Sequence, residues 1–361
     1  MWPTVQAAIS HTSTKAKIMY YPHIAMLKTK CLFLVVVMHC VMFFATPFPF
    51  WKLYADSAQP LADLITAISG TTLIQSFMMA SGFLFAAAWD SGKRTPLQHL
   101  LHRGRRLLLP WFGVGMLWVA PLYWLFSIPA FGHPADTSLV DTWKSVALGL
   151  FTDHLWFLLV LFWVTVFWIA ALGVLKKCGH DTAVAGGMVA LVAALCVQNY
   201  GQWIKWYCLW EVPAYILCYY LGIVIFRNRE SLDAMCRKHP LALGAGLLAM
   251  IILLWPYAFA PVSGWALSLL CALLMYHMFL LTAGLYPLLH SISLFAWFER
   301  NGFRFYLFHL PTPLLVFMWL YKRLQLPPAA FVLLNVAITL AVTAAIVAAS
   351  RKLEEKLGIR L

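Results

Sequence analysis

Ten long apolar runs, joined by short polar or charged segments, constrain this sequence more than any other feature. A transmembrane helix needs about 20 predominantly apolar residues, and each run is long enough, or nearly long enough, to cross a bilayer. The predicted spans are residues 24–44, 66–89, 107–128, 154–175, 183–200, 206–226, 240–257, 263–286, 302–321 and 328–350. Only 11% of the residues are charged, against about 25% in soluble domains. We therefore predict an all-α polytopic membrane protein of ten transmembrane helices, forming one domain over residues 1–361.

Lysine and arginine are distributed unevenly along the chain, and this sets the predicted orientation. If the N-terminal segment 1–22 is cytoplasmic, most of the 26 basic residues fall on cytoplasmic segments. The outer side receives only Lys52, Lys144, Lys205, Lys322 and Arg323. Cytoplasmic loops of membrane proteins are enriched in Lys and Arg, so we predict that both termini, including the tail 351–361, are cytoplasmic. The same rule accounts for the net charge of +13 without a nucleic-acid partner.

The first predicted span carries a lysine and a histidine on one helical face. His39 lies well inside the span, and Lys28 stands eleven residues earlier at its cytoplasmic mouth. At about 100° and 1.5 Å per residue, the two side chains share a face and are separated by roughly 16 Å along the axis. Ionisable groups inside a span are costly and often functional, and histidine is the usual general base near neutral pH. The alternative is that His39 is a hydrogen-bonded packing residue and Lys28 an ordinary interfacial anchor.

A second group of positive charges follows the second predicted span, in a segment that we expect to be a cytoplasmic loop. Arg103 and Arg106 have i, i+3 spacing, so in a helical conformation they project on one side and can clamp a phosphate with their planar forks. They lie on the same predicted side of the membrane as Lys28. The alternative is that the cluster serves only to keep this segment in the cytoplasm.

Five short motifs stand in a definite order along the chain. They are Lys28 with His39, Ser81-Gly82-Phe83, Arg103-x-x-Arg106 running into Leu107-Leu108-Leu109-Pro110-Trp111, His154-Leu155-Trp156-Phe157-Leu158, and Tyr306-Leu307-Phe308-His309-Leu310-Pro311. Each motif is weak alone, but their order and spacing over about residues 20–350 resemble acyltransferase family 3, a family of integral membrane O-acyltransferases.

The resemblance implies a ten-helix enzyme of the bacterial inner membrane that moves an acyl group, often acetyl or succinyl, from cytoplasmic acyl-CoA to a hydroxyl of an extracytoplasmic or cell-envelope saccharide. It implies that Lys28 and His39 are needed for activity, that Arg103 and Arg106 contact the donor, and that acyl-CoA is a co-substrate with no tightly bound cofactor. The segment 154–161 is similar to the glucan-succinylating branch. Many family members carry an acid just ahead of the basic residue of helix one, whereas residues 21–28 contain none, so Lys28 needs another partner.

Coenzyme A suits the spacing of Lys28 and His39. Its nucleotide end bears several phosphate charges, and its pantetheine arm is roughly as long as the separation of the two side chains. Capture of the phosphates at the mouth would place the thioester near the midplane. There His39 could remove a proton from the acceptor hydroxyl, or take up the acyl group transiently.

Four other residues are candidates for contacting the acceptor or for structural roles. They are His154 and Trp156 at the outer end of the fourth span, Glu211 in the sixth and His309 in the ninth. The outer loop 129–153, with Asp136, Asp141 and Asp153, could carry part of an outer-facing site. No His, Cys, Asp and Glu set has metal-ligand spacing, the eight cysteines form no CxxC pair, and Ser81-Gly82 is expected to let helices approach closely.

Two other classes of protein would fit a chain of this kind. A transporter or flippase for a saccharide, a lipid-linked sugar or an acyl donor would need a coupling-ion site and broken helices in corresponding positions of two halves. For the coupling-ion site the sequence offers only Glu211 as an intramembrane acid, and it gives no clear sign of broken helices in two halves. A non-catalytic scaffold would leave Lys28 and His39 on one face by chance. The sequence does not indicate an oligomeric state.

Overall fold

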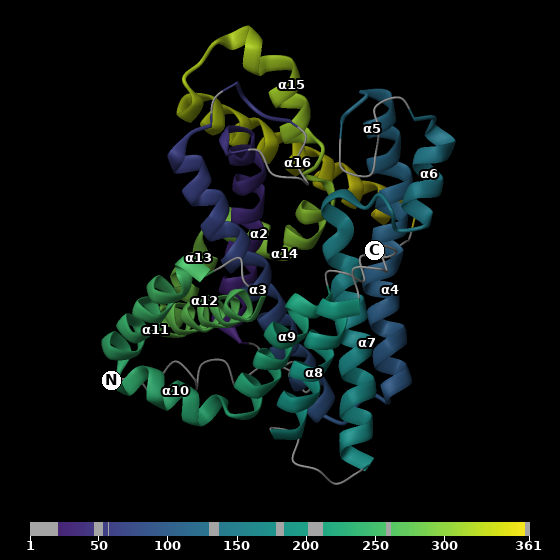
Figure 1. The fold of residues 1–361 in the computed structure, drawn as a ribbon. Coiled ribbons are helices and arrows are strands. Elements are labelled where there is room, and N and C mark those ends of the chain that lie inside the picture. Colours follow the sequence, from purple (N-terminus) through teal and green to yellow (C-terminus); the bar gives the residue numbers. More distant parts are fainter. Residues whose placement is uncertain are drawn as a thin grey trace.

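The structure, a computed structural model, describes residues 21–46, 53–56, 58–129, 137–177, 184–200, 212–257 and 261–357. Every regular element in these ranges is a helix (Figure 1). The longer helices are α2 (Pro22–Val41), α3 (Pro60–Asp90), α4 (Pro96–Val114), α7 (Trp156–Lys177), α8 (Val184–Tyr200), α9 (Val212–Arg227), α11 (Pro240–Leu254), α12 (Pro261–Leu281), α14 (Ser293–Phe308), α15 (Thr312–Leu324) and α16 (Pro328–Leu357). The shorter ones are η1 (Met42–Phe44), the π-helical η2 (Gly115–Val119), α5 (Ala120–Leu125), α6 (Leu139–Ala147), η3 (Asp153–Leu155), α10 (Arg229–Lys238), η6 (Trp255–Tyr257), η7 (Ala283–Leu285) and α13 (Tyr286–Ser291).

Six stretches of the described chain are long and apolar enough to cross a membrane. They are Pro22–Phe44, Pro60–Asp90, Pro96–Leu125, Asp153–Lys176, Gly264–Leu281 and Pro328–Lys356. The number rises to eight if two bent pairs, α10 with α11 and α14 with α15, each count as one span. The prediction of an all-α integral membrane protein is confirmed in this form, while the total of ten spans and the cytoplasmic termini stay predictions.

The ninth predicted span, 302–321, is wrong as a single helix. The axis bends by 69° between α14, which ends at Phe308, and α15, which begins at Thr312. Pro311 causes the break, because it has no backbone N–H to donate and its ring collides with the preceding turn. The break frees backbone carbonyl groups in the middle of the bundle, and these groups need donors from other elements.

The basic segment after the second span is also different from the prediction, since it is helical rather than a loop. Thr95 and Gln98 form a capping box at its start, in which the Gln98 N–H donates to Thr95 Oγ1 at 3.3 Å and the Thr95 N–H donates to Gln98 Oε1 at 2.9 Å. This reciprocal cap begins α4 at Pro96. Arg103 and Arg106 therefore lie inside a helix and share one side of it.

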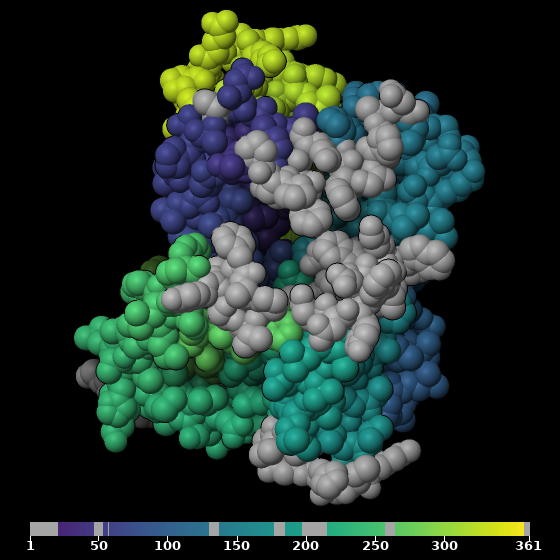
Figure 2. Space-filling view, in the orientation of Figure 1, coloured from purple at the N-terminus to yellow at the C-terminus, as the bar shows by residue number. Residues whose placement is uncertain are grey.

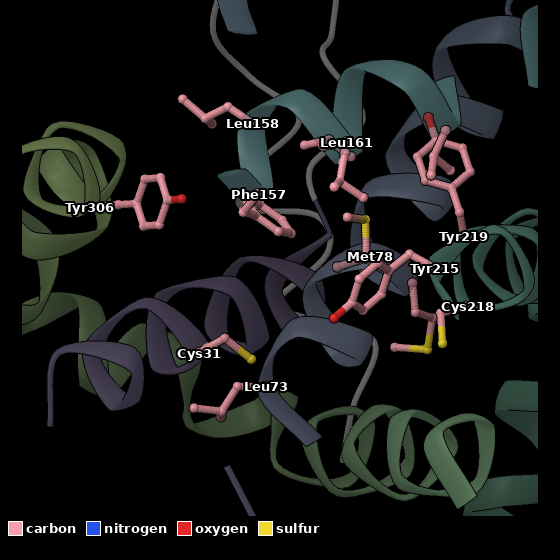
Figure 3. Packing of buried hydrophobic residues seen from close by; sticks show 14 of the residues in the cluster. Cys31, Leu73, Met78, Phe157, Leu158, Leu161, Tyr215, Cys218, Tyr219 and Tyr306 are labelled. Atoms are coloured by element: carbon pink, nitrogen blue, oxygen red, sulfur yellow. The ribbon is translucent and has the colours of Figure 1, made fainter. Parts of the chain in front are cut away.

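Helix α3 lies at the centre of the bundle and contacts α2, α9 and α12, while α4 packs along α7 and α16 packs against α14 and α15. One large cluster of buried apolar side chains joins these helices. Figure 3 shows part of it, including Met78 of α3, Phe157 and Leu161 of α7 and Tyr215 of α9. The face of the molecule seen in Figure 2 is hollowed near its centre, where violet, green and teal segments meet.

Helices α3 and α9 approach each other closely at two glycines. A Cβ atom at Gly82 would lie 1.9 Å from the carbonyl oxygen of Tyr219, and a Cβ atom at Gly222 would lie 1.9 Å from the carbonyl oxygen of Met79. Helix association in a bilayer depends on close packing of this kind, because lipid tails are as apolar as the side chains. The prediction that Ser81-Gly82 lets helices approach closely is confirmed.

Replacing Gly82 with Ala is expected to lower the stability of the folded protein by about 1–3 kcal/mol, the range for overpacking a core. The added methyl group meets backbone rather than a flexible side chain, so α3 and α9 must move apart. Gly70→Ala on the same helix is the matched control, since nothing lies within 4 Å of a Cβ atom there. Thermal unfolding of both variants in detergent checks this, and equal midpoints would contradict the close contact.

Candidate active site

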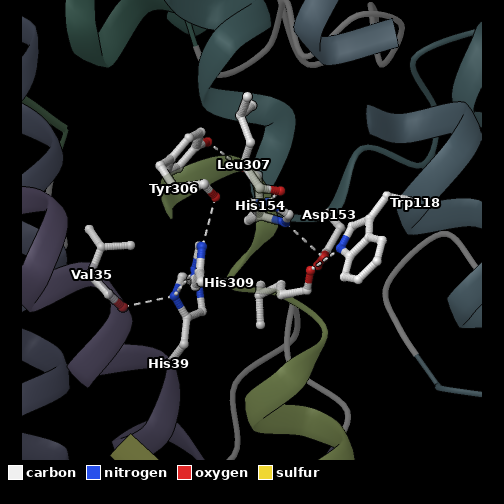
Figure 4. Close-up of polar contacts among 9 residues, drawn as sticks. Val35, His39, Trp118, Asp153, His154, Tyr306, Leu307 and His309 are labelled. Atoms are coloured by element: carbon white, nitrogen blue, oxygen red, sulfur yellow. Dashed lines mark hydrogen bonds and ion pairs between the residues drawn. The ribbon is translucent and has the colours of Figure 1, made fainter. Parts of the chain in front are cut away.

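Two histidines from distant parts of the chain meet inside the bundle (Figure 4). Nδ1 of His39, on α2, lies 2.8 Å from the carbonyl oxygen of Val35 and 3.3 Å from Nε2 of His309. Nδ1 of His309 lies 2.7 Å from the carbonyl oxygen of Tyr306. His309 is fully buried and His39 is half-buried. The imidazole of His39 therefore faces a polar side chain of the interior.

These contacts determine which ring nitrogens carry protons. A carbonyl oxygen only accepts hydrogen bonds, so Nδ1 of His39 donates to Val35 and Nδ1 of His309 donates to Tyr306. In the neutral rings both Nε2 atoms then carry lone pairs. The Nδ1–H of His39 is shared between the Val35 carbonyl oxygen and Nε2 of His309, and the lone pair of His39 lies on its own Nε2.

A third histidine, His154, supplies a hydrogen-bond donor to a carbonyl group freed by the helix break. In an unbroken helix the Leu307 carbonyl oxygen would accept from residue 311, which is a proline without an N–H. Nε2 of His154 lies 3.1 Å from this oxygen and replaces the missing donor. Nε1 of Trp118 donates to the Leu310 carbonyl oxygen at 2.9 Å, and the Tyr306 hydroxyl donates to the His154 carbonyl oxygen. The broken helix is thus held by side chains from elements that lie far away in sequence.

Asp153 adds a negative charge to this group. Its Oδ2 lies 3.1 Å from Nδ1 of His154, and its side chain is only 10% exposed. Because oxygen acceptors face both ring nitrogens of His154, that ring offers a substrate no lone pair. The charge of Asp153 also interacts with His39. The neutral His39 ring, with Nδ1 as its donor, has its basic nitrogen at Nε2.

A separate group of three cations lies around the first half of α2. The charge of Lys28 interacts with the charges of Arg103 and Arg106 on α4, and Nζ of Lys28 lies 5.4 Å from the centre of the Phe77 ring. A cation over an aromatic face is stabilised by the ring quadrupole. Phe77 is thus a partner of Lys28 among the residues that the structure describes.

No carboxylate of the described residues is within ion-pair distance of these three cations. Other basic side chains of the protein do have such partners, as Arg227 lies 3.0 Å from Asp90 and Arg304 lies 2.6 Å from Glu354. Like charges brought together without counter-ions repel one another, so the group is suited to a polyanionic ligand.

One known protein family matches most of this chain. The profile of acyltransferase family 3, described as an acyltransferase domain, matches residues 23–350. The chain belongs to acyltransferase family 3. Its activity is therefore that of an integral membrane acyltransferase that transfers groups other than amino-acyl groups. In comparisons with curated proteins and with solved structures, nothing matches this chain.

In this family 3 acyltransferase, the residues singled out from the sequence gather at two places. His39, His154 and His309 meet at the helix break, and Lys28, Arg103 and Arg106 form the cation group. Sequence reasoning did not bring the three histidines together, nor did it find Trp118. The signal that was available is Pro311 within an apolar run, which implies a break and freed carbonyl groups.

The other candidates lie apart from both places. Trp156 packs against the ring of Tyr215, with 5.9 Å between centroids, and so helps to join α7 to α9. Glu211 and Asp136 lie outside the described residues.

The predicted outer loop contains the short helix α6, which Ser138 caps by accepting the Asp141 N–H at 3.1 Å. The Ser138 hydroxyl donates to Asp141 at 2.6 Å, and Nζ of Lys144 lies 3.1 Å from the same carboxylate. The Ser138 hydroxyl, followed by the Lys144 ammonium, lowers the pKa of the Asp141 carboxyl below its usual value. This acid is thus engaged in a local structural role.

Proposed function

We propose that this acyltransferase moves an acetyl- or succinyl-class group from cytoplasmic acyl-CoA to a hydroxyl of an extracytoplasmic or cell-envelope saccharide, at the inner membrane of a bacterium. One observation carries the proposal. Lys28 on α2 interacts with the charges of Arg103 and Arg106 on α4, and eleven residues further along α2 stands a histidine whose Nδ1–H is engaged by the protein. A nucleotide-linked thioester suits this arrangement, because its phosphate groups can lie at the three cations while its reacting carbonyl lies at the histidine.

In the donor site, Lys28, Arg103 and Arg106 bind the phosphate groups of coenzyme A. Arginine forks make paired hydrogen bonds to phosphate oxygens, and charge-assisted hydrogen bonds are about twice as strong as neutral ones. Binding of the remote nucleotide holds the thioester in register with His39, which lowers the entropic part of the barrier. The pantetheine arm then extends along α2.

In the chemical step, Nε2 of His39 takes the proton of the acceptor hydroxyl while the hydroxyl oxygen attacks the thioester carbonyl carbon. The carbon–sulfur bond breaks, and the thiolate of coenzyme A takes the proton back from Nε2. The products are an ester and free coenzyme A, and His39 returns to its starting state. A positioned general base of this kind contributes typically about 10²–10⁴-fold to a rate.

Mass analysis of envelope glycans from cells with and without the protein tests the proposal. We expect a mass difference equal to one acyl group per modified hydroxyl, and its value identifies both the acyl group and the acceptor. Glycans that are identical in the two strains, with the purified protein also unable to transfer label from acyl-CoA to them, would contradict the saccharide assignment. Coupled movement of an unmodified saccharide across the membrane would favour the transporter alternative.

A further inference from the structure

We propose that His309 is the positioning residue of His39: its Nε2 lone pair holds the His39 ring with the proton on Nδ1 and supports the imidazolium that forms during transfer. This inference rests on the proposed function, because it assumes that His39 is the base. His309 acts through His39 and contacts no reacting atom.

The contact between the two rings carries the inference. Nε2 of His309 lies 3.3 Å from Nδ1 of His39, with 5.1 Å between ring centroids and 52° between ring planes. The Val35 carbonyl oxygen, the other acceptor at Nδ1, belongs to the same helix as His39. His309 is the acceptor contributed by another part of the chain, the break between α14 and α15, so it relates the orientation of the His39 ring to the rest of the bundle.

His309 is itself held in place before any substrate binds. Its Nδ1–H donates to the Tyr306 carbonyl oxygen at 2.7 Å, which leaves the lone pair on the nitrogen that faces His39. Its ring lies edge-on to the ring of His154 at 4.9 Å and 74°. The side chain is fully buried. The break at Pro311 therefore provides a preorganised acceptor on the far side of the base.

This acceptor matters most after proton transfer. Once Nε2 of His39 has taken the hydroxyl proton, both ring nitrogens carry hydrogens and the ring is positively charged. The Nδ1–H then donates to Nε2 of His309 as a charge-assisted hydrogen bond, which is stronger than the neutral one. An interaction that strengthens as the reaction proceeds lowers the barrier rather than the Michaelis constant.

Two amide variants separate this role from a purely structural one. In His309→Gln the side-chain amide reaches the position of Nε2, and its oxygen can accept from His39. In His309→Asn the amide reaches only the position of Nδ1, so it can donate to the Tyr306 carbonyl oxygen but cannot reach His39. We expect the Gln variant to keep kcat within about tenfold of the native enzyme, and the Asn variant to lose on the order of 10²-fold or more, with the donor KM unchanged in both.

The measurement is kcat and donor KM with labelled acyl-CoA, expressed per folded molecule from a parallel thermal unfolding curve. An Asn variant as active as the Gln variant, or more active, would show that only the Tyr306 contact matters and would overturn the inference. Equal loss of kcat in both variants would overturn it as well. Retained activity in His39→Ala would instead contradict the proposed function, because His39 would not be the base. That result differs from a His309→Asn variant whose kcat equals or exceeds that of His309→Gln, which contradicts only the role of His309.

Discussion

Replacing His39 with Ala is expected to reduce acyl transfer by on the order of 10²–10⁴-fold, the contribution of a positioned general base, and so to abolish it in a practical assay. The physical reason is that the hydroxyl proton loses its acceptor. The neighbouring rings cannot replace it, since the Nε2 lone pair of His309 is directed at His39 and oxygen acceptors occupy both nitrogens of His154. The measurement is transfer of labelled acyl groups from acyl-CoA by purified protein.

The matched control for His39 is His290→Ala. His290 lies on α13, its side chain is 46% exposed, and its nearest acid is Glu299 at 3.9 Å. We expect this variant to keep full activity. Normal transfer by folded His39→Ala protein would remove His39 from the mechanism. A labelled acyl group recovered on His39 after rapid quenching without acceptor would show covalent transfer in place of base catalysis.

Replacing both Arg103 and Arg106 with Ala is expected to raise the apparent donor constant by about 10²-fold, with the acceptor constant little changed. A hydrogen bond to a charged group contributes about 1.5–3 kcal/mol, and about 1.4 kcal/mol corresponds to a factor of ten. Arg106 is exposed, and water screens its charge, so we take the low end of the range for each arginine. The low end corresponds to about tenfold for each arginine and about 10²-fold for the pair. Initial rates over a range of acyl-CoA concentrations measure it.

Arg105→Ala is the control for the arginine pair. Arg105 carries the same charge on the same helix, but the interaction with Lys28 involves Arg103 and Arg106. We expect the Arg105 variant to bind the donor normally. If all three arginines contribute equally, the effect comes from the net positive charge of α4 rather than from a defined phosphate site. An unchanged donor constant in the double variant would exclude the pair from the donor site.

The grouping of Lys28 with Arg103 and Arg106 could be anticipated from the sequence, because it depends largely on local periodicity. Lys28 and His39 are eleven residues apart on one helix, and Arg103 and Arg106 are one turn apart, so helical geometry alone places each pair on one side. The sequence also indicated that the three cations lie on the same side of the membrane. Helix α4 includes both arginines because it begins at the Thr95–Gln98 cap. These two residues form a capping-box pattern in the sequence, which predicts a helix start at this point.

The histidine cluster could not be predicted in the same way. His39, His154 and His309 come from elements separated by more than a hundred residues, and no local pattern states which helices become neighbours. From the sequence, a structural and a functional interpretation therefore stayed open for both His154 and His309. In the structure His154 Nε2 faces the Leu307 carbonyl oxygen, which Pro311 cannot serve as a donor, and His309 lies against the proposed base.

The amino-acid sequence by itself determined that this chain is a helical membrane protein of an acyltransferase family, because apolar length, charge asymmetry and short ordered motifs are local properties. Only the tertiary structure decided that the ninth apolar run is broken and that the break is held by His154 and Trp118. Only it decided that a second histidine lies against His39. The reason is that a freed carbonyl group in a bilayer must find a donor, and the donor is chosen by which helices pack together.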